Sequence, residues 1–172
     1  MSKLALGTVQ FGTDYGINSG VQVQPDEVSR IIDYARNNSI NLLDTAQLYG
    51  SSEKVLGKIG IKNWKVTSKL SSVPNDCKDI QSWIKNQLVI TLYNLKIESI
   101  DTLLLHRPHQ LVSNIGGEIS VALDNLKKEG FNIETASNGK DGLKIMKKFT
   151  PDLIIVDVMM PEIDGIEFCS IL

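Results

Sequence analysis

The chain has 172 residues, 42% hydrophobic and 22% charged, which suffices for one well-buried domain or slightly more. Its net charge of −2, with both signs mixed along the chain, offers no basic patch for nucleic acid. No apolar run approaches the roughly 18 residues of a membrane span, and the N-terminus lacks a signal pattern. Cys77 and Cys169 stand outside any metal-binding motif and are expected to be free thiols. We therefore expect a soluble, cytoplasmic protein without nucleic-acid or membrane partners.

Strands and helices are expected to alternate through the first hundred residues. The expected strands cover 3–9, 40–45, 64–69 and 100–105, and the helices between them begin at Pro25, at Ser51 or Ser52, and near residue 77. Within each helix, apolar residues recur at i, i+3 and i+4, the spacing of one buried face. Alternation of this kind predicts parallel strands joined by right-handed crossovers.

The last third of the chain continues the alternation. A looser segment leads to a helix at 118–128, which Gly130 is expected to end. Two further strands are expected at 131–136 and 153–157, with a helix at 140–149 between them. The sequence thus predicts an α/β protein with about six parallel strands.

Three of the expected strands end in side chains suited to proton transfer. Asp44 lies near the end of the second strand and Tyr49 follows it, Lys69 ends the third strand, and His106 directly follows the fourth. Parallel strands bring such side chains to one C-terminal rim. A lysine can stabilise the phenolate of a tyrosine, an aspartate can hold that lysine, and a histidine can polarise a carbonyl oxygen. Since His106 and His109 lack a third ligand, no metal site is predicted.

Four motifs surround these residues. They are Leu-Ala-Leu-Gly-Thr at 4–8, Leu-Leu-Asp-Thr-Ala-Gln-Leu-Tyr-Gly at 42–50, Val-Thr-Ser-Lys at 66–69, and Asp-Thr-Leu-Leu-Leu-His-Arg-Pro at 101–108. Glu53 and Gly57 follow the second motif at a familiar spacing. Together the motifs resemble the N-terminal half of an aldo-keto reductase, a family of eight-stranded (β/α) barrels.

This resemblance implies an oxidoreductase that uses NADPH to reduce a small carbonyl substrate. Tyr49 would be the proton donor, and Lys69 the cation that eases its ionisation. Asp44 would hold the lysine, and His106 would orient the carbonyl group. Thr8 and Asp44 would lie near the nicotinamide ribose of the cofactor.

A second resemblance covers the chain from about residue 121 onward. The stretch Pro-Asp-Leu-Ile-Ile-Val-Asp-Val-Met-Met-Pro-Glu-Ile-Asp-Gly at 151–165 resembles a response-regulator receiver domain, which has a flavodoxin-like fold. The resemblance implies that Asp157 would be the phospho-acceptor of a two-component phosphorelay. Receivers hold a divalent cation with an acidic pair at the end of their first strand, whereas the corresponding strand here ends in His106 and Arg107. We therefore expect Asp157 to stay unphosphorylated.

The chain is thus expected to be a hybrid, with an aldo-keto reductase-like half barrel at 1–127 and a receiver-like βαβ fragment at 128–172. The resemblance implies that the six strands form a partial (β/α) barrel, and because an eight-stranded barrel would not be closed, two open sheet edges would favour a homo-oligomer. Loops after the later strands hold much of the NADPH in the family, so we expect weak cofactor binding and doubtful activity. Three alternatives stay open: an oxidoreductase, a phospho-acceptor module, and an inactive chimera, whether natural, engineered or truncated.

Overall fold

The chain forms two compact units, Met1–Leu123 and Asp124–Leu172. The computed structural model describes residues 4–16, 20–128, 138–146, 162–163 and 167. The division between the units falls within helix α4 (Gly116–Lys128), as does the sequence-predicted domain boundary after residue 127. Within the described ranges, no helix combines the length and the apolar composition that crossing a membrane requires.

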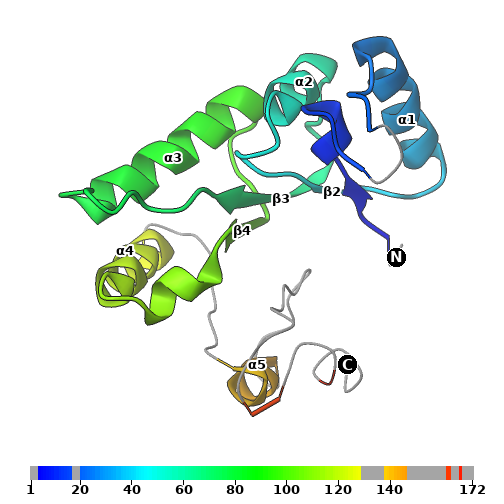
Figure 1. Ribbon diagram of the computed structural model, residues 1–172. Coiled ribbons are helices and arrows are strands. Elements are labelled where there is room, and N and C mark those ends of the chain that lie inside the picture. The colour runs from blue at the N-terminus through cyan, green and yellow to red at the C-terminus, as the bar shows by residue number, and fades with distance from the viewer. Residues whose placement is uncertain (1–3, 17–19, 129–137, 147–161, 164–166, 168–172) are drawn as a thin grey trace. The chain divides into compact units, whose positions relative to one another are not determined.

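A parallel sheet of four strands forms the centre of the first unit (Figure 1). The strands are β1 (Leu6–Gly7), β2 (Leu42–Asp44), β3 (Lys65–Leu70) and β4 (Thr102–Leu105). Each strand is hydrogen-bonded to the next in chain order, and the register places Gly7 beside Asp44 and Asp44 beside Thr67. Chain-order pairing is the topology of a (β/α) barrel, whereas a doubly wound sheet reverses at a switch point.

The predicted parallel α/β fold is confirmed for these four strands, although β1, β2 and β4 are shorter than expected and β3 begins one residue later. Strand β1 ends at Gly7 because the chain turns into the 3-10 helix η1 (Val9–Phe11). Beyond β2, the backbone N–H of Thr45 still donates to Thr67 O at 2.9 Å, so pairing outlasts the assigned strand. The expected strands at 131–136 and 153–157 lie outside the described residues, so the prediction of six strands and of a flavodoxin-like fragment stays a prediction.

Three helices follow the first three strands and line one side of the sheet in Figure 1. They are α1 (Pro25–Asn37), α2 (Ser52–Ile59) and α3 (Ile80–Leu95). Helix α3 begins later than predicted because the side chain of Asp79 caps it, accepting a hydrogen bond from Ser82 N at 2.9 Å. Helices α2 and α3 meet at Gly57, where an added Cβ would lie 2.1 Å from Asn94 O. The core includes Val28, Ile32, Leu43, Leu56, Val66, Ile84, Leu88 and Leu95, all buried.

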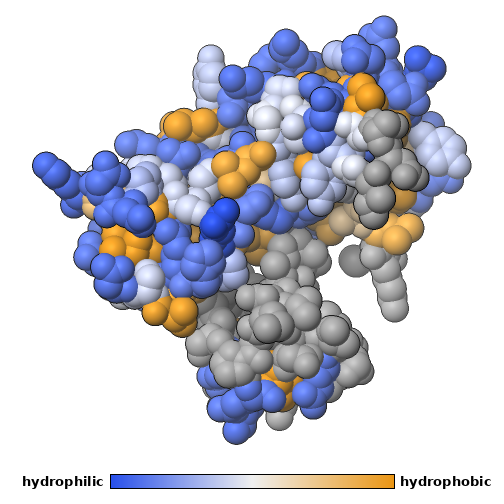
Figure 2. Space-filling view, in the orientation of Figure 1, coloured by the Kyte–Doolittle hydropathy of each residue, from blue (hydrophilic) through white to orange (hydrophobic). Residues whose placement is uncertain are grey.

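The chain after β4 forms the 3-10 helix η2 (Pro108–Val112) and then α4. In the second unit, helix α5 (Gly139–Met146) begins after Asn138, whose side-chain oxygen accepts from Asp141 N at 2.9 Å. The helix predicted at 140–149 thus begins one residue earlier, at Gly139, after this cap. On the face drawn in Figure 2, hydrophobic residues form small patches among hydrophilic ones.

Candidate active site

Tyr49 lies on a tight turn after β2 that rests directly on the loop after β1. Gly50 has a φ of 56°, in the left-handed region that favours glycine. An added Cβ on Gly12 would lie 1.7 Å from Tyr49 O, so only glycine permits this approach. The backbone N–H of Ser51 donates to Gly12 O at 3.1 Å and closes the contact. The turn that carries Tyr49 is therefore placed by backbone packing on both sides.

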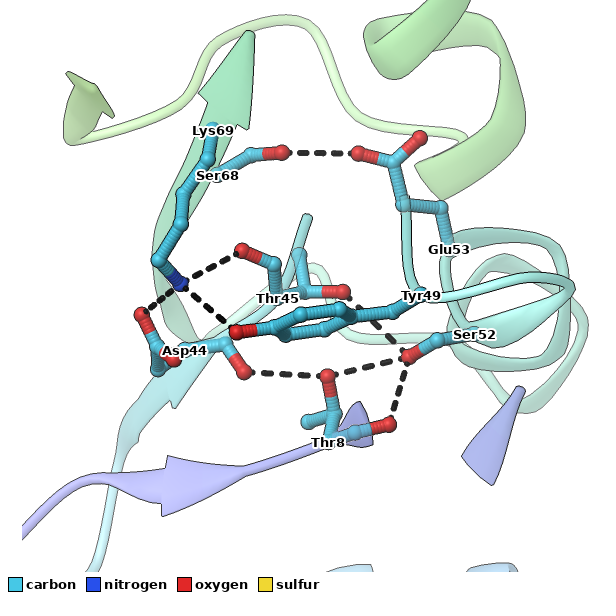
Figure 3. A network of polar contacts seen from close by, with 8 residues as sticks. All are labelled: Thr8, Asp44, Thr45, Tyr49, Ser52, Glu53, Ser68 and Lys69. Carbon is cyan, nitrogen blue, oxygen red and sulfur yellow. Dashed lines mark hydrogen bonds and ion pairs between the residues drawn. The ribbon is translucent and has the colours of Figure 1, made fainter. Parts of the chain in front are cut away.

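Lys69, near the end of β3, contacts several residues of the candidate site (Figure 3). Its Nζ donates to Asp44 Oδ1 at 2.6 Å, to Thr45 O at 3.1 Å and to the Tyr49 hydroxyl at 3.2 Å. The lysine side chain is 14% exposed and that of Asp44 is 29% exposed. With three acceptors around its three N–H groups, the ammonium has a fixed position.

His106 follows β4 and lies beside Tyr49. Its backbone N–H donates to Leu70 O at 2.9 Å, which extends the pairing of β3 and β4. The ring centroids of His106 and Tyr49 are 6.0 Å apart, in an edge-to-face arrangement at 82°. Burial lowers the pKa of His106 below its usual value, and the positive charges of Lys69 and Arg107 lower it further. The imidazole is therefore neutral at physiological pH.

The tautomer of His106 follows from its surroundings. Its Nδ1 is buried and has no hydrogen-bond partner among the residues that the structure describes. A proton on Nδ1 would be a buried, unpaired N–H, which is costly. This cost favours the tautomer with the proton on Nε2, from which the neutral ring can donate one hydrogen bond.

Thr8 binds the backbone of Asp44 through two hydrogen bonds. Its backbone N–H and its Oγ1 both donate to Asp44 O at 3.0 Å, and its side chain is fully buried. Ser52 Oγ lies 2.9 Å from both Thr8 O and Thr8 Oγ1, and 3.3 Å from Thr45 Oγ1. The Thr8 hydroxyl thus has partners within the protein, and its expected place near a cofactor ribose stays a prediction.

Sequence reasoning assigned no role to Glu53, yet this residue is the centre of a buried polar cluster. The side chain, 4% exposed, accepts hydrogen bonds from Ser68 Oγ at 2.7 Å and from Thr91 Oγ1 at 3.1 Å. Asn94 Nδ2 donates to its other oxygen at 3.4 Å. The signal available in the sequence was its place in the motif, directly after the turn of Tyr49. Glu53 ties helices α2 and α3 to Ser68, the neighbour of Lys69.

The four residues predicted to be catalytic are thus brought together by the structure, and they form a layer of intermediate exposure over a buried polar layer. The layer of intermediate exposure comprises Asp44, Tyr49, Lys69 and His106, and the buried layer comprises Thr8, Thr45, Ser52, Glu53, Ser68 and Thr91. Asp157, the predicted phospho-acceptor, lies outside the described residues. Among the residues that are described, no three His, Cys, Asp or Glu side chains gather as a metal site would require.

A comparison with protein families identifies this arrangement. The model of the aldo/keto reductase family matches residues 3–160. The chain belongs to this family. A solved structure from Pseudomonas aeruginosa, described as an aldo-keto reductase, is 29% identical with a TM-score of 0.61, and the match covers 76% of this chain and 52% of that one.

A Bombyx mori aldo-keto reductase solved in complex with NADP shares the fold. It is 20% identical with a TM-score of 0.59, and the match covers 98% of this chain and 59% of that one. The chain therefore spans between half and three-fifths of the length of these two solved relatives.

The second predicted resemblance also has a counterpart among known proteins. The transcriptional regulatory protein AfsQ1 of Streptomyces coelicolor is 43% identical over 63 residues, which are 36% of this chain and 28% of that protein. The predicted resemblance to two families, a reductase and a response regulator, is confirmed. The limits of the two parts, 1–127 and 128–172, stay a prediction.

Proposed function

We propose that the site around Lys69 reduces a small aldehyde or ketone with NADPH. The observation that carries this proposal is the position of one ammonium group, 2.6 Å from Asp44 Oδ1 and 3.2 Å from the Tyr49 hydroxyl. A cation so close to the phenolic oxygen stabilises the negative charge that develops when Tyr49 gives up its proton. The tyrosine is thereby suited to protonate an alkoxide.

Asp44 supports this chemistry by holding the lysine. Its carboxylate neutralises the ammonium in a mostly buried setting and fixes the direction of its N–H groups. Because Thr8 binds the Asp44 carbonyl through both its N–H and its hydroxyl, the backbone that carries the carboxylate is fixed. The charge beside Tyr49 is therefore in place before substrate arrives, which is the condition for electrostatic preorganisation.

His106 is the proposed orienting group for the carbonyl. A neutral imidazole with its proton on Nε2 donates a hydrogen bond to the carbonyl oxygen without competing with Tyr49 as the acid. The lowered pKa of His106 keeps the ring in this neutral form over the physiological pH range. Tyr49 and His106, whose rings are in edge-to-face contact, would share the two sides of one substrate oxygen.

The proposed cofactor is NADPH, which when bound supplies the hydride that is added to the carbonyl carbon. The residues present fit its nicotinamide end, because all four reactive side chains have intermediate exposure while their supports are buried. Asp44, at 29% exposure, would face the ribose, with Thr8 acting through it. The NADP complex of the Bombyx mori relative supports the choice of cofactor.

The test is consumption of NADPH in the presence of a simple aliphatic aldehyde. At NADPH concentrations high enough to offset the weak cofactor binding expected from the sequence, the wild-type chain should consume it, and Tyr49→Phe is expected to lose on the order of 10²-fold or more of the rate, the usual contribution of a positioned acid. Tyr93→Phe is the matched control, because Tyr93 is 81% exposed on α3 and takes no part in the site. Equal rates for wild type and Tyr49→Phe would contradict the proposal, as would the absence of any NADPH binding.

A further inference from the structure

The backbone that continues β3 beyond Leu70 is held by two glutamine side chains. We call residues 71–73 the β3 extension. Ser71 N donates to Gln47 Oε1 at 3.0 Å, and Val73 N donates to Gln110 Oε1 at 2.9 Å. Gln110 also returns a bond, from its Nε2 to Val73 O at 2.9 Å. Side-chain amides thus supply the bonds that neighbouring strands would otherwise make.

Gln47 belongs to the turn that carries Tyr49. Its backbone N–H reaches Lys69 O at 3.4 Å, so the turn still follows β3 at this point. Its Nε2 donates to Gln87 O at 2.8 Å and to Thr91 Oγ1 at 3.0 Å, both on helix α3. The side chain therefore ties the turn to the β3 extension and to the helix above it. Gln47 is two residues before Tyr49, on the same turn.

Gln110 belongs to η2, the short helix that follows His106. The backbone bond from His106 N to Leu70 O holds one end of this segment against β3. The paired bonds of Gln110 to Val73 hold the other end. The segment from His106 to Gln110 is thus attached at both of its ends to the same neighbouring chain segment.

We propose that Gln47 and Gln110 are positioning residues for the proposed carbonyl reduction, because they fix the segments bearing Tyr49 and His106 to the β3 extension. This inference rests on the proposed function, and it names residues that touch neither substrate nor cofactor. The β3 extension directly follows Lys69 and Leu70. Both glutamines therefore attach their segments to the strand that bears the Lys69 ammonium. A displacement of about 1 Å at a reacting group can cost on the order of 100-fold in rate.

If the two glutamines served only to stabilise the fold, their removal would disturb the order of the sheet and helices. Both glutamines have intermediate exposure and pack no part of the apolar core, so their removal leaves the buried leucines and isoleucines in place. The bonds of Gln110 join two segments at one rim of the sheet, and those of Gln47 join the turn of Tyr49 to the β3 extension and to helix α3. Removal should therefore loosen the rim while the sheet and helices keep their order.

The experiment compares Gln47→Leu with Gln110→Leu in the full chain, by amide hydrogen exchange. In Gln47→Leu, the Ser71 amide should exchange about tenfold faster while Val73 is unchanged, and in Gln110→Leu the reverse should hold, since about tenfold is the net value of one hydrogen bond. Each variant is the folding control for the other. Loss of both protections in either variant, or of neither, would overturn the proposal.

A second measurement reports the geometry of the site without any activity. The Tyr49 ring lies edge-to-face with His106 at 6.0 Å and shifts the resonances of the His106 ring protons. Tyr49→Leu defines the position of those resonances without the aromatic ring. Gln47→Leu and Gln110→Leu should each move the resonances toward this reference. Resonances that stay at the wild-type position in both variants would show that neither glutamine positions the pair, whether or not the chain reduces aldehydes.

The third measurement uses the rate. If the wild type reduces an aldehyde, each leucine variant should lower kcat by roughly 10- to 100-fold and leave the KM for NADPH within about twofold. A higher KM with an unchanged kcat would overturn the positioning role. If the wild type has no activity, the proposed function fails and the resonance test still decides whether the glutamines hold Tyr49 and His106 together.

Discussion

Replacing the buried Glu53 by leucine is expected to lower the free energy of unfolding of the first unit by about 3 kcal/mol. The carboxylate accepts from Ser68 Oγ and Thr91 Oγ1, and both hydroxyls are fully buried. Two hydrogen bonds to a charged group are worth about 3–6 kcal/mol. Leucine also removes the cost of burying a carboxylate, so the net loss should fall at the lower end of that range.

Urea unfolding followed by the fluorescence of Trp64 and Trp83, both in the first unit, measures this change. If the unfolding free energy falls by about 2 kcal/mol per molar urea, a loss of about 3 kcal/mol lowers the urea concentration at the unfolding midpoint by about 1.5 M. The slope itself should stay constant. Glu53→Gln is the matched control, because it keeps the shape and one acceptor oxygen. We expect it to cost only about 1 kcal/mol, the difference between charged and neutral hydrogen bonds.

A double-mutant cycle decides whether the hydrogen bonds are the cause. Ser68→Ala should destabilise the wild type but cost about 1 kcal/mol less in the Glu53→Leu background, where its hydroxyl has already lost the carboxylate. Additive effects would refute the reasoning. So would a Glu53→Leu variant as stable as the wild type, because the desolvation of the carboxylate would then cancel its bonds.

Three further predictions concern other parts of the chain. Gly12→Ala should cost roughly 2–3 kcal/mol in urea unfolding because the new Cβ would lie 1.7 Å from Tyr49 O, whereas Gly7→Ala, with no atom within 4 Å, should change stability by less than about 0.5 kcal/mol. The folded state lowers the pKa of His106, so the unfolded chain takes up this proton first as pH falls; stability should decline as pH drops below about 6.5, and His106→Asn should flatten this dependence in urea unfolding at several pH values. Incubation with a small acyl phosphate and magnesium should leave the mass of the chain unchanged, because the strand that would supply a receiver's acidic pair ends in His106 and Arg107; a gain of one phosphoryl group at Asp157 would contradict this.

The sequence predicted the part of the site that follows from strand order. Parallel strands place their C-terminal ends at one rim, so Asp44, Lys69 and His106 could be expected together before any coordinates. The helix faces also followed from apolar spacing, as in the buried Ile84 and Leu88 of α3. These features depend on local periodicity, which a single sequence displays directly.

The contacts that hold the site were not predictable in the same way. Gln47 and Gln110 each bind a backbone group far along the chain, and nothing in their local pattern distinguishes them from solvent-facing glutamines. Glu53 lies in the first turn of a helix, where an exposed acid is common, and only the approach of α3 buries it. Thr8 was assigned to a cofactor by resemblance, while its buried hydroxyl serves the Asp44 carbonyl. Such roles depend on tertiary contacts and leave no periodic signal.

Every contact described for the proton-transfer set joins residues of the first unit, Met1–Leu123. In gene recombination, a segment that encodes the first unit would therefore carry all residues of these contacts together. A crossover beyond Leu123 would leave every residue that makes these described contacts unchanged in sequence. Mutations that tune Lys69 or its neighbours would accordingly accumulate upstream of that point, and the downstream part could change its ancestry while the site kept its form.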